Sequence, residues 1–86
     1  FKGIDEVKRI ASDFKIKDIN KIKPGVGETT RVLLRRVPDR ILIRKDANPK
    51  YLQHILQLAE EKQVPVEYYP LEKYNVCGII KELADL

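Results

Sequence analysis

The chain has 86 residues, which is enough for one domain with a single modest hydrophobic core. Hydrophobic residues make up 43% of it and charged residues 35%, a balance that is typical of globular domains and excludes a disordered chain. No apolar run approaches the roughly 20 residues needed to span a bilayer, so no membrane insertion is expected. The single cysteine, Cys77, excludes an intramolecular disulfide and a Cys-x-x-Cys metal pair, and we expect it to be a small buried core residue.

The positive charge is concentrated in the middle of the sequence. The whole chain has a net charge of +4, residues 21–45 carry +6, and the rest carries −2. Clustered Lys and Arg are the electrostatic footprint of a polyanionic partner. The alternative is a solvated basic face that has no partner.

The N-terminal third predicts a helix followed by a short strand. Apolar residues recur at i, i+3, i+4 and i+7 over residues 5–14, which is the spacing of an amphipathic helix. Asp5 is a suitable N-cap, because its carboxylate can accept from the free amides of the first turn. A turn at residues 17–18 and a short strand near 19–22 are expected next.

The central part predicts a second helix and a buried strand. Prolines and glycines at residues 24–27 break the chain, and a helix is expected from about residue 28 to residue 37. This helix would face the core through Val32, Leu33 and Val37. The short apolar run at 40–44, flanked by charges, predicts a strand that is buried on both faces.

The third helix has the clearest signals in the sequence. Asn48 is a good N-cap, and Pro49 occupies the first helical position, where its missing amide costs nothing. The apolar stripe of this helix consists of Leu52, Ile55, Leu56 and Ala59.

The C-terminal third predicts two strands. Residues 64–69 alternate like a strand, and Pro65 belongs at its start or at a sheet edge, because it cannot donate to the ladder. Residues 71–74 are expected to form a turn or a single helical turn. A final strand is expected over 75–80, followed by a tail at 81–86 with helical character; a helix across the last twelve residues is the alternative.

This order of elements predicts the fold class. Strand–helix–strand units need right-handed crossovers and place strands beside one another in parallel. Three amphipathic helices cannot all pack on one face of a small four-stranded sheet. We therefore predict an α/β fold, a three-layer α-β-α sandwich with a small mixed, mostly parallel four-stranded sheet, in one domain over residues 1–86.

The segment 25–31 is the strongest candidate for a binding site. It joins a strand to a helix N-terminus, where free amides and the helix dipole favour an anion. We expect glycines to open the backbone, a glutamate to accept from a guanine edge, threonines to offer hydroxyls and arginines to hold phosphates: Gly25, Gly27, Glu28, Thr29, Thr30, Arg31 and Arg35. The alternative is an ordinary glycine-rich turn in which Glu28 only complements the dipole. The segment matches neither a Walker P-loop nor a dinucleotide motif.

Nothing in the sequence predicts catalysis. His54 is the only histidine, and it has no Asp, Cys or second His at ligand spacing. We therefore predict that the chain is not an enzyme and holds neither a metal nor a cofactor. The tyrosines can stack on unpaired bases or pack at the boundary of the core, and they are Tyr51, Tyr68, Tyr69 and Tyr74.

Three motifs support a resemblance to a known family. Residues 25–31 resemble Gly-x-Asn-Glu-x-Thr-Lys, residues 43–49 resemble Ile-Ala-Glu-Asp-x-Asp-Pro, and residues 58–66 resemble Leu-x-x-Glu-Lys-x-Val-Pro. These motifs mark the RNA-binding fold of kink-turn-binding archaeal and eukaryotic ribosomal proteins, Pelota and class-1 release factors. The Gly-Val-x-Glu form and the short chain favour the Pelota-type branch.

The resemblance implies a structured RNA partner, bound across the Gly25–Arg31 turn and the loop near 71–76. It implies that Glu28 reads guanine in sheared G·A pairs and that Arg31 meets the RNA backbone. Gly27 stands where the family has Asn, so one base-reading hydrogen bond is missing and ribosomal or tRNA-type RNA joins the kink-turn as a candidate. The full set of predicted RNA-binding residues is Lys23, Gly25, Gly27, Glu28, Thr29, Thr30, Arg31, Arg35, Lys45 and Lys73.

Two other functions stay open. The N-terminal domain of SpoU-type ribose methyltransferases shares this fold and the stretch at 58–66, so the chain can be the substrate-binding appendage of such an enzyme. A protein-interaction domain without RNA contact is the other alternative. The chain begins at Phe1 without a Met, so we expect a domain of a longer protein, and we expect that protein to be cytoplasmic. The resemblance implies a possible fusion to a catalytic domain, because bacterial domains that resemble this one occur fused to other modules, including phosphoribosyltransferase-like ones.

Overall fold

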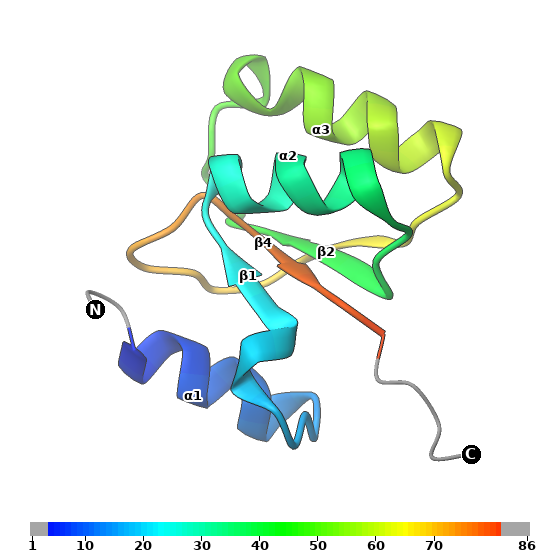
Figure 1. Cartoon of the computed structure of the whole chain (residues 1–86). Coiled ribbons are helices and arrows are strands. Elements are labelled where there is room, and N and C mark those ends of the chain that lie inside the picture. The colour runs from blue at the N-terminus through cyan, green and yellow to red at the C-terminus, as the bar shows by residue number, and fades with distance from the viewer. Residues whose placement is uncertain (1–3, 82–86) are drawn as a thin grey trace.

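Three α-helices and four strands form the fold of residues 4–81, the part of the chain that the computed structural model describes (Figure 1). No helix in this part is long and apolar enough to cross a lipid bilayer. In chain order the elements are α1 (Ile4–Asp13), the 3₁₀ turn η1 (Ile19–Lys21), β1 (Ile22–Pro24), α2 (Val26–Arg35), β2 (Arg40–Ile43), α3 (Pro49–Glu61), β3 (Val66–Tyr68) and β4 (Val76–Ile79).

The sheet has the strand order β1-β4-β2-β3. β2 and β3 pair in parallel, with Ile41 opposite Val66, whereas β4 runs antiparallel to both β1 and β2. The predicted mixed sheet is confirmed, and β1, β2 and β3 all run in the same direction. Only one neighbouring pair is parallel, however, because β4 returns through the middle of the sheet instead of joining its edge.

The predicted three layers are also confirmed, with α1 on one face of the sheet and α2 and α3 on the other (Figure 1). Side chains alternate along each strand, so Leu42 and Cys77 pack toward α1, whereas Ile41, Ile43 and Val76 pack toward α2 and α3. Both faces of β2 are therefore buried, as expected. Full burial of one such aliphatic side chain contributes about 1.5–3 kcal/mol.

The capping signals of α3 and the edge position of β3 are confirmed. The Asn48 side chain accepts from the Lys50 amide at 2.9 Å, and Pro49 is the first helical residue. β3 begins directly after Pro65 and lies at the sheet edge. The final strand is confirmed as β4, and residues 71–74 form an irregular bend rather than a helical turn. Of the predicted tail, residues 82–86 lie outside the described part of the chain.

Three predicted boundaries are wrong. Asp5 lies in the first turn of α1 and is not its N-cap, because the helix already includes Ile4. The strand expected near 19–22 is a 3₁₀ turn as far as Lys21, because isoleucines spaced by three suit three residues per turn and the Asp18 side chain accepts from the Asn20 amide at 2.9 Å. α2 begins at Val26 and ends at Arg35, so Val37 lies beyond it and is 48% exposed instead of facing the core. The following Pro38 disfavours helical geometry at Val37.

Candidate functional site

Three connections meet at one end of the sheet, where β1, β2 and β3 have their C-terminal ends. Because β1, β2 and β3 run in the same direction, the segments that leave their C-terminal ends gather there: the turn into α2, residues 44–48 and residues 69–75 (Figure 1). Backbone hydrogen bonds tie them together, from the Gly25 amide to the Val76 carbonyl (2.8 Å) and from the Arg44 amide to the Asn75 carbonyl (2.9 Å). The region outside the carboxyl ends of strands is a common position for ligand sites in α/β proteins.

The turn into α2 needs its first glycine for conformational reasons. Gly25 has φ +95°, a conformation that side chains other than glycine rarely adopt. A Cβ at Gly25 would lie 3.7 Å from the ring of Tyr74, so the 69–75 loop packs beside the turn. Gly27 is exposed, and a Cβ there would meet no atom within 4 Å in the described structure. The backbone at Gly27 is therefore open to a ligand.

A hollow of about 370 Å³ lies beside the turn, between α2 and the η1–β1 segment. Five cationic side chains line it, together with the acidic Asp18 and Glu28. We call this hollow the basic groove; its cations are Lys21, Lys23, Arg31, Arg35 and Arg36. Their fields add, because charges of one sign line the same hollow.

One ion pair joins two residues of α2 that line the basic groove. Arg31 Nη1 lies 3.4 Å from Glu28 Oε1, and these side chains are 62% and 48% exposed. An exposed pair of this kind contributes at most about 1 kcal/mol. The two side chains can therefore exchange their mutual contact for a ligand at little cost.

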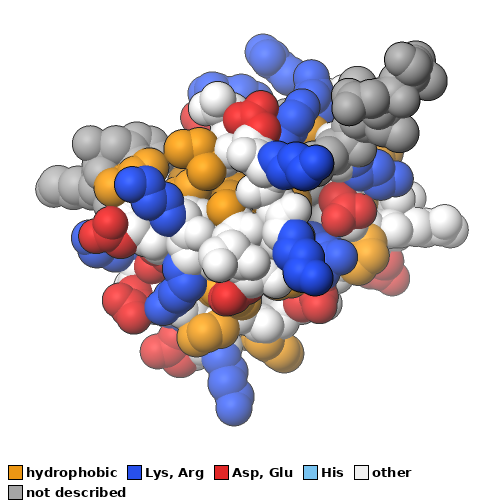
Figure 2. Space-filling view, turned by 90° about the horizontal axis from the view of Figure 1, so that it is seen from below, with side chains coloured by type: hydrophobic (Ala, Val, Ile, Leu, Met, Phe, Trp, Pro, Cys, Tyr) orange, Lys and Arg blue, Asp and Glu red, His pale blue; other side chains and the backbone are white. Residues whose placement is uncertain are grey.

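A second hollow of about 340 Å³ adjoins the basic groove and is mainly apolar. Asn20, Lys23 and Glu28 line both hollows. The other lining residues are Ile4, Val7, Ile19, Ile22, Pro24 and Tyr74. Figure 2 views the α1 side of the molecule and shows a patch of hydrophobic side chains with Lys and Arg side chains near it.

The structure brings four of the predicted RNA-binding residues together in the basic groove and buries a fifth in the core. Lys23, Glu28, Arg31 and Arg35 line the basic groove. Thr29 is fully buried, and its hydroxyl donates to the Lys23 carbonyl at 3.2 Å. The prediction that Thr29 offers its hydroxyl to a ligand is therefore wrong, because this residue is on the inward face of α2.

Thr30 is half-buried, and its hydroxyl is already engaged on both sides. It donates to the Val26 carbonyl at 2.7 Å and lies 2.9 Å from Nε2 of His54. With its hydrogen used on Val26, the Thr30 oxygen accepts from the His54 ring. The only histidine of the chain thus joins α3 to α2.

Lys45 and Lys73 lie outside the basic groove. Lys45 lines a smaller hollow beside β3 and α3, and Lys73 lines another that it shares with Glu6, Arg9 and Glu72. In their place the groove contains Lys21 and Arg36, which the predicted set omitted. The excess of charge over residues 21–45 pointed to both, but only the η1 turn brings Lys21 across from α2.

Cys77 is fully buried in the sheet, as predicted. Burial raises the pKa of the Cys77 thiol to about 12, and the negative charge of Glu6 contributes to the same shift. The thiol therefore stays protonated at neutral pH, and a thiolate is the nucleophilic form of cysteine. Within residues 4–81, no group of three or more His, Cys, Asp and Glu side chains is arranged to hold a metal ion.

Comparison with known proteins supplies two findings. Residues 1–82 match the family described as the PELOTA RNA binding domain. The chain is also 41% identical over 79 residues to a protein of Acinetobacter baylyi named cysteine protease StiP. The match covers 90% of this chain but 20% of that relative, so the chain spans about a fifth of the relative's length.

Proposed function

The chain belongs to the Pelota RNA-binding domain family, and from this premise we propose that it binds structured RNA through the basic groove and the Gly25–Arg31 turn. The observation that carries the proposal is the gathering of five cations in one hollow that runs along α2, from Glu28 in its first turn to Arg36 just past its end. RNA presents phosphates at regular spacing, and cations that neutralise them release condensed counterions. A groove of this composition is suited to that exchange.

We assign different parts of the RNA to the residues of the site. The guanidinium groups of Arg31 and Arg35 hold phosphates, each with several donors in a fixed plane. Glu28 stands between the basic groove and the apolar hollow and accepts from the edge of a guanine once it leaves Arg31. The open backbone at Gly27 allows a base to approach closely. A kink-turn with its sheared G·A pairs is the RNA that suits these roles best.

The proposal includes no chemistry by this chain itself. Its only thiol is buried and protonated at neutral pH, and its only histidine contacts a threonine on a neighbouring helix. We propose that it is the RNA-binding part of a longer cytoplasmic protein whose catalytic function lies elsewhere. The relative named as a protease is five times longer than the matched region, which accords with such an arrangement.

The proposal is tested by titrating the chain with a kink-turn RNA and with an unrelated hairpin of equal length, each at two salt concentrations. We expect tighter binding of the kink-turn, with log K falling by about 0.7–0.9 per phosphate contact for each tenfold rise in salt. A preference that survives high salt supports guanine reading by Glu28. Equal, salt-sensitive binding of both RNAs limits the function to docking on phosphates, and no binding of either contradicts RNA binding.

A further inference from the structure

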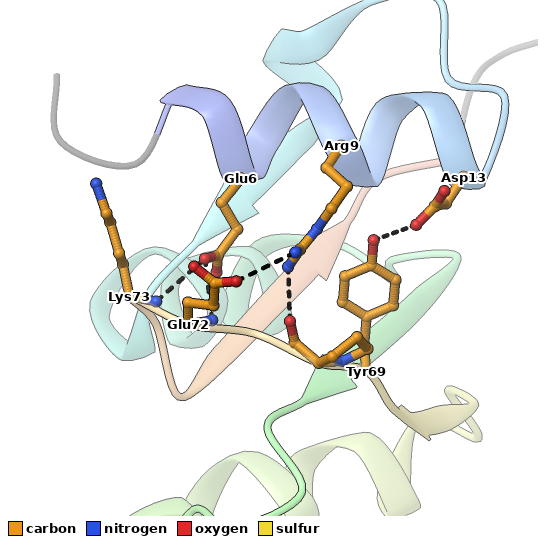
Figure 3. Close-up of polar contacts among 7 residues, drawn as sticks. Glu6, Arg9, Asp13, Tyr69, Glu72 and Lys73 are labelled. Atoms are coloured by element: carbon orange, nitrogen blue, oxygen red, sulfur yellow. Dashed lines mark hydrogen bonds and ion pairs between the residues drawn. The ribbon is translucent and has the colours of Figure 1, made fainter.

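One side of α1 is attached to the loop that leads into β4. Glu6, Arg9 and Asp13 are spaced at i, i+3 and i+7, so they lie along one side of the helix (Figure 3). All three contact residues 69–73, in reverse chain order. Asp13 accepts from the Tyr69 hydroxyl, Arg9 Nη2 donates to the Pro70 carbonyl at 2.6 Å, and Glu6 accepts from the amides of Glu72 and Lys73.

Glu6 makes the most unusual of these contacts. Its Oε2 accepts from two successive backbone amides, those of Glu72 at 3.0 Å and Lys73 at 3.1 Å. Glu6 is only 7% exposed, although it is a charged residue near the start of an amphipathic helix. Burial of a carboxylate is costly unless hydrogen bonds compensate for the lost water. The loop amides compensate Oε2 in this position, whereas Oε1 is buried without a hydrogen-bond partner among residues 4–81.

The segment that Glu6 holds is next to the proposed RNA site. Tyr74 directly follows the two bound amides, its ring lies against Gly25, and it lines the apolar hollow together with Glu28. Residues 70–75 contain no helix or strand, so no regular ladder fixes their course. A shift of this loop moves Tyr74 relative to the turn.

We propose that Glu6 is a positioning residue for RNA recognition, which fixes the 70–75 loop so that Tyr74 stands beside Gly25 and Glu28. This inference rests on the proposed function. It assigns the two helical layers, on opposite faces of the sheet, different parts in RNA binding. α2 and the η1–β1 segment supply the charges, while α1 holds the loop without touching the RNA.

The test compares Glu6→Ala and Glu6→Gln with the unchanged chain and with Glu61→Ala, which removes an exposed carboxylate on α3. Amide hydrogen exchange reports the loop, and titration with the kink-turn RNA reports binding. In Glu6→Ala we expect faster exchange at Glu72 and Lys73 and roughly tenfold weaker binding, comparable to the cost of ordering one residue of backbone. The salt slope should stay unchanged, because the cations of the basic groove remain.

Glu6→Gln retains an oxygen for the two amides, so we expect it to retain most of the protection and affinity even if Glu6→Ala fails to fold. Glu61→Ala should match the unchanged chain. If the Glu72 and Lys73 amides exchange faster in Glu6→Ala while its RNA affinity and preference stay unchanged, this inference is wrong but the proposed function stands. The same holds if Glu6→Gln loses the protection of these amides and still binds RNA normally. No RNA binding by the unchanged chain would overturn the proposed function, and this inference with it.

Discussion

The two faces of the sheet are covered by different kinds of contact. On the face covered by α2 and α3, the buried cluster consists of aliphatic side chains, including Leu33, Ile41 and Ile55. On the α1 face, an apolar cluster is bordered by the polar contacts that run from α1 to residues 69–73. The helix layer of α2 and α3 is therefore held to the sheet by apolar packing. The α1 layer is held by apolar packing and also fixes the 69–73 segment through polar contacts. The proposed RNA site depends on both.

The largest expected effect concerns the α1 face at high pH. The pKa of the Cys77 thiol is about 12 in the folded chain and about 9 when the thiol is in water, so the folded state retains a proton that the unfolded state loses. The resulting stabilisation is complete below about pH 9 and is lost as the pH rises toward 12. By about pH 11 the loss should be roughly 3 kcal/mol.

Urea unfolding from pH 8 to pH 11 measures this loss, with Cys77→Ala as the comparison. Every other titratable group is the same in the two chains, so its contribution cancels in the difference. The difference in stability between the two chains should narrow or reverse with rising pH. A constant difference would contradict the burial of this thiol as a protonated group.

On the α2 face, the double variant Arg31→Ala/Arg35→Ala should weaken binding of all RNAs about a hundredfold, at roughly tenfold for each lost charge-assisted contact. The slope of log K against log salt should fall by about the equivalent of two phosphates. The matched control is Lys8→Ala/Lys50→Ala, which removes two exposed cations away from the basic groove. Equal losses in both double variants would show that net charge, and not the groove, governs binding.

A smaller effect is expected from Glu28→Gln, which keeps the size of the side chain and removes its charge. If Glu28 reads guanine, discrimination between the kink-turn and a version with its G·A pairs replaced should drop about tenfold, within the 1–3 kcal/mol of a bidentate base contact. Competition binding with the two RNAs measures the ratio. Because the substitution also frees Arg31 from its ion pair, affinity for the replaced RNA should hold or rise slightly. An unchanged ratio would exclude the base-reading role.

The smallest effect concerns the end of the α1 contacts. Tyr69→Phe removes the hydroxyl that donates to Asp13 and should lower the free energy of unfolding by about 1 kcal/mol. Tyr68→Phe is the matched control, because Tyr68 is 75% exposed and should lose nothing measurable. Denaturant unfolding of both variants at pH 7 measures the difference. Equal stabilities would show that this contact adds nothing to the attachment of the loop.

Local signals in the sequence were sufficient to predict the elements that are determined by residues close together in the chain. Asn48 and Pro49 marked the start of α3, and the short apolar run within 40–44 marked the doubly buried strand. The inward position of Thr29 was also visible in principle, because it precedes Val32 and Leu33 by three and four residues on the same helix.

Features that depend on distant parts of the chain were not predictable. The insertion of β4 between β1 and β2 follows from pairings across tens of residues, which no local period encodes. The contact of Glu6 with the Glu72 amide joins positions 66 residues apart. In the sequence Glu6 is one more charged residue on an amphipathic helix, and only the fold shows what it holds.

The most direct test of the central claim is an amide chemical-shift map of the chain during titration with the kink-turn RNA. We predict the largest shifts at residues 25–31, with further shifts at the basic-groove residues 21–23 and 35–36 and in the 70–75 loop, and little change along the exposed side of α3. Shifts confined to α3 and β3, or no shifts at millimolar RNA, would contradict RNA binding through the basic groove and the Gly25–Arg31 turn.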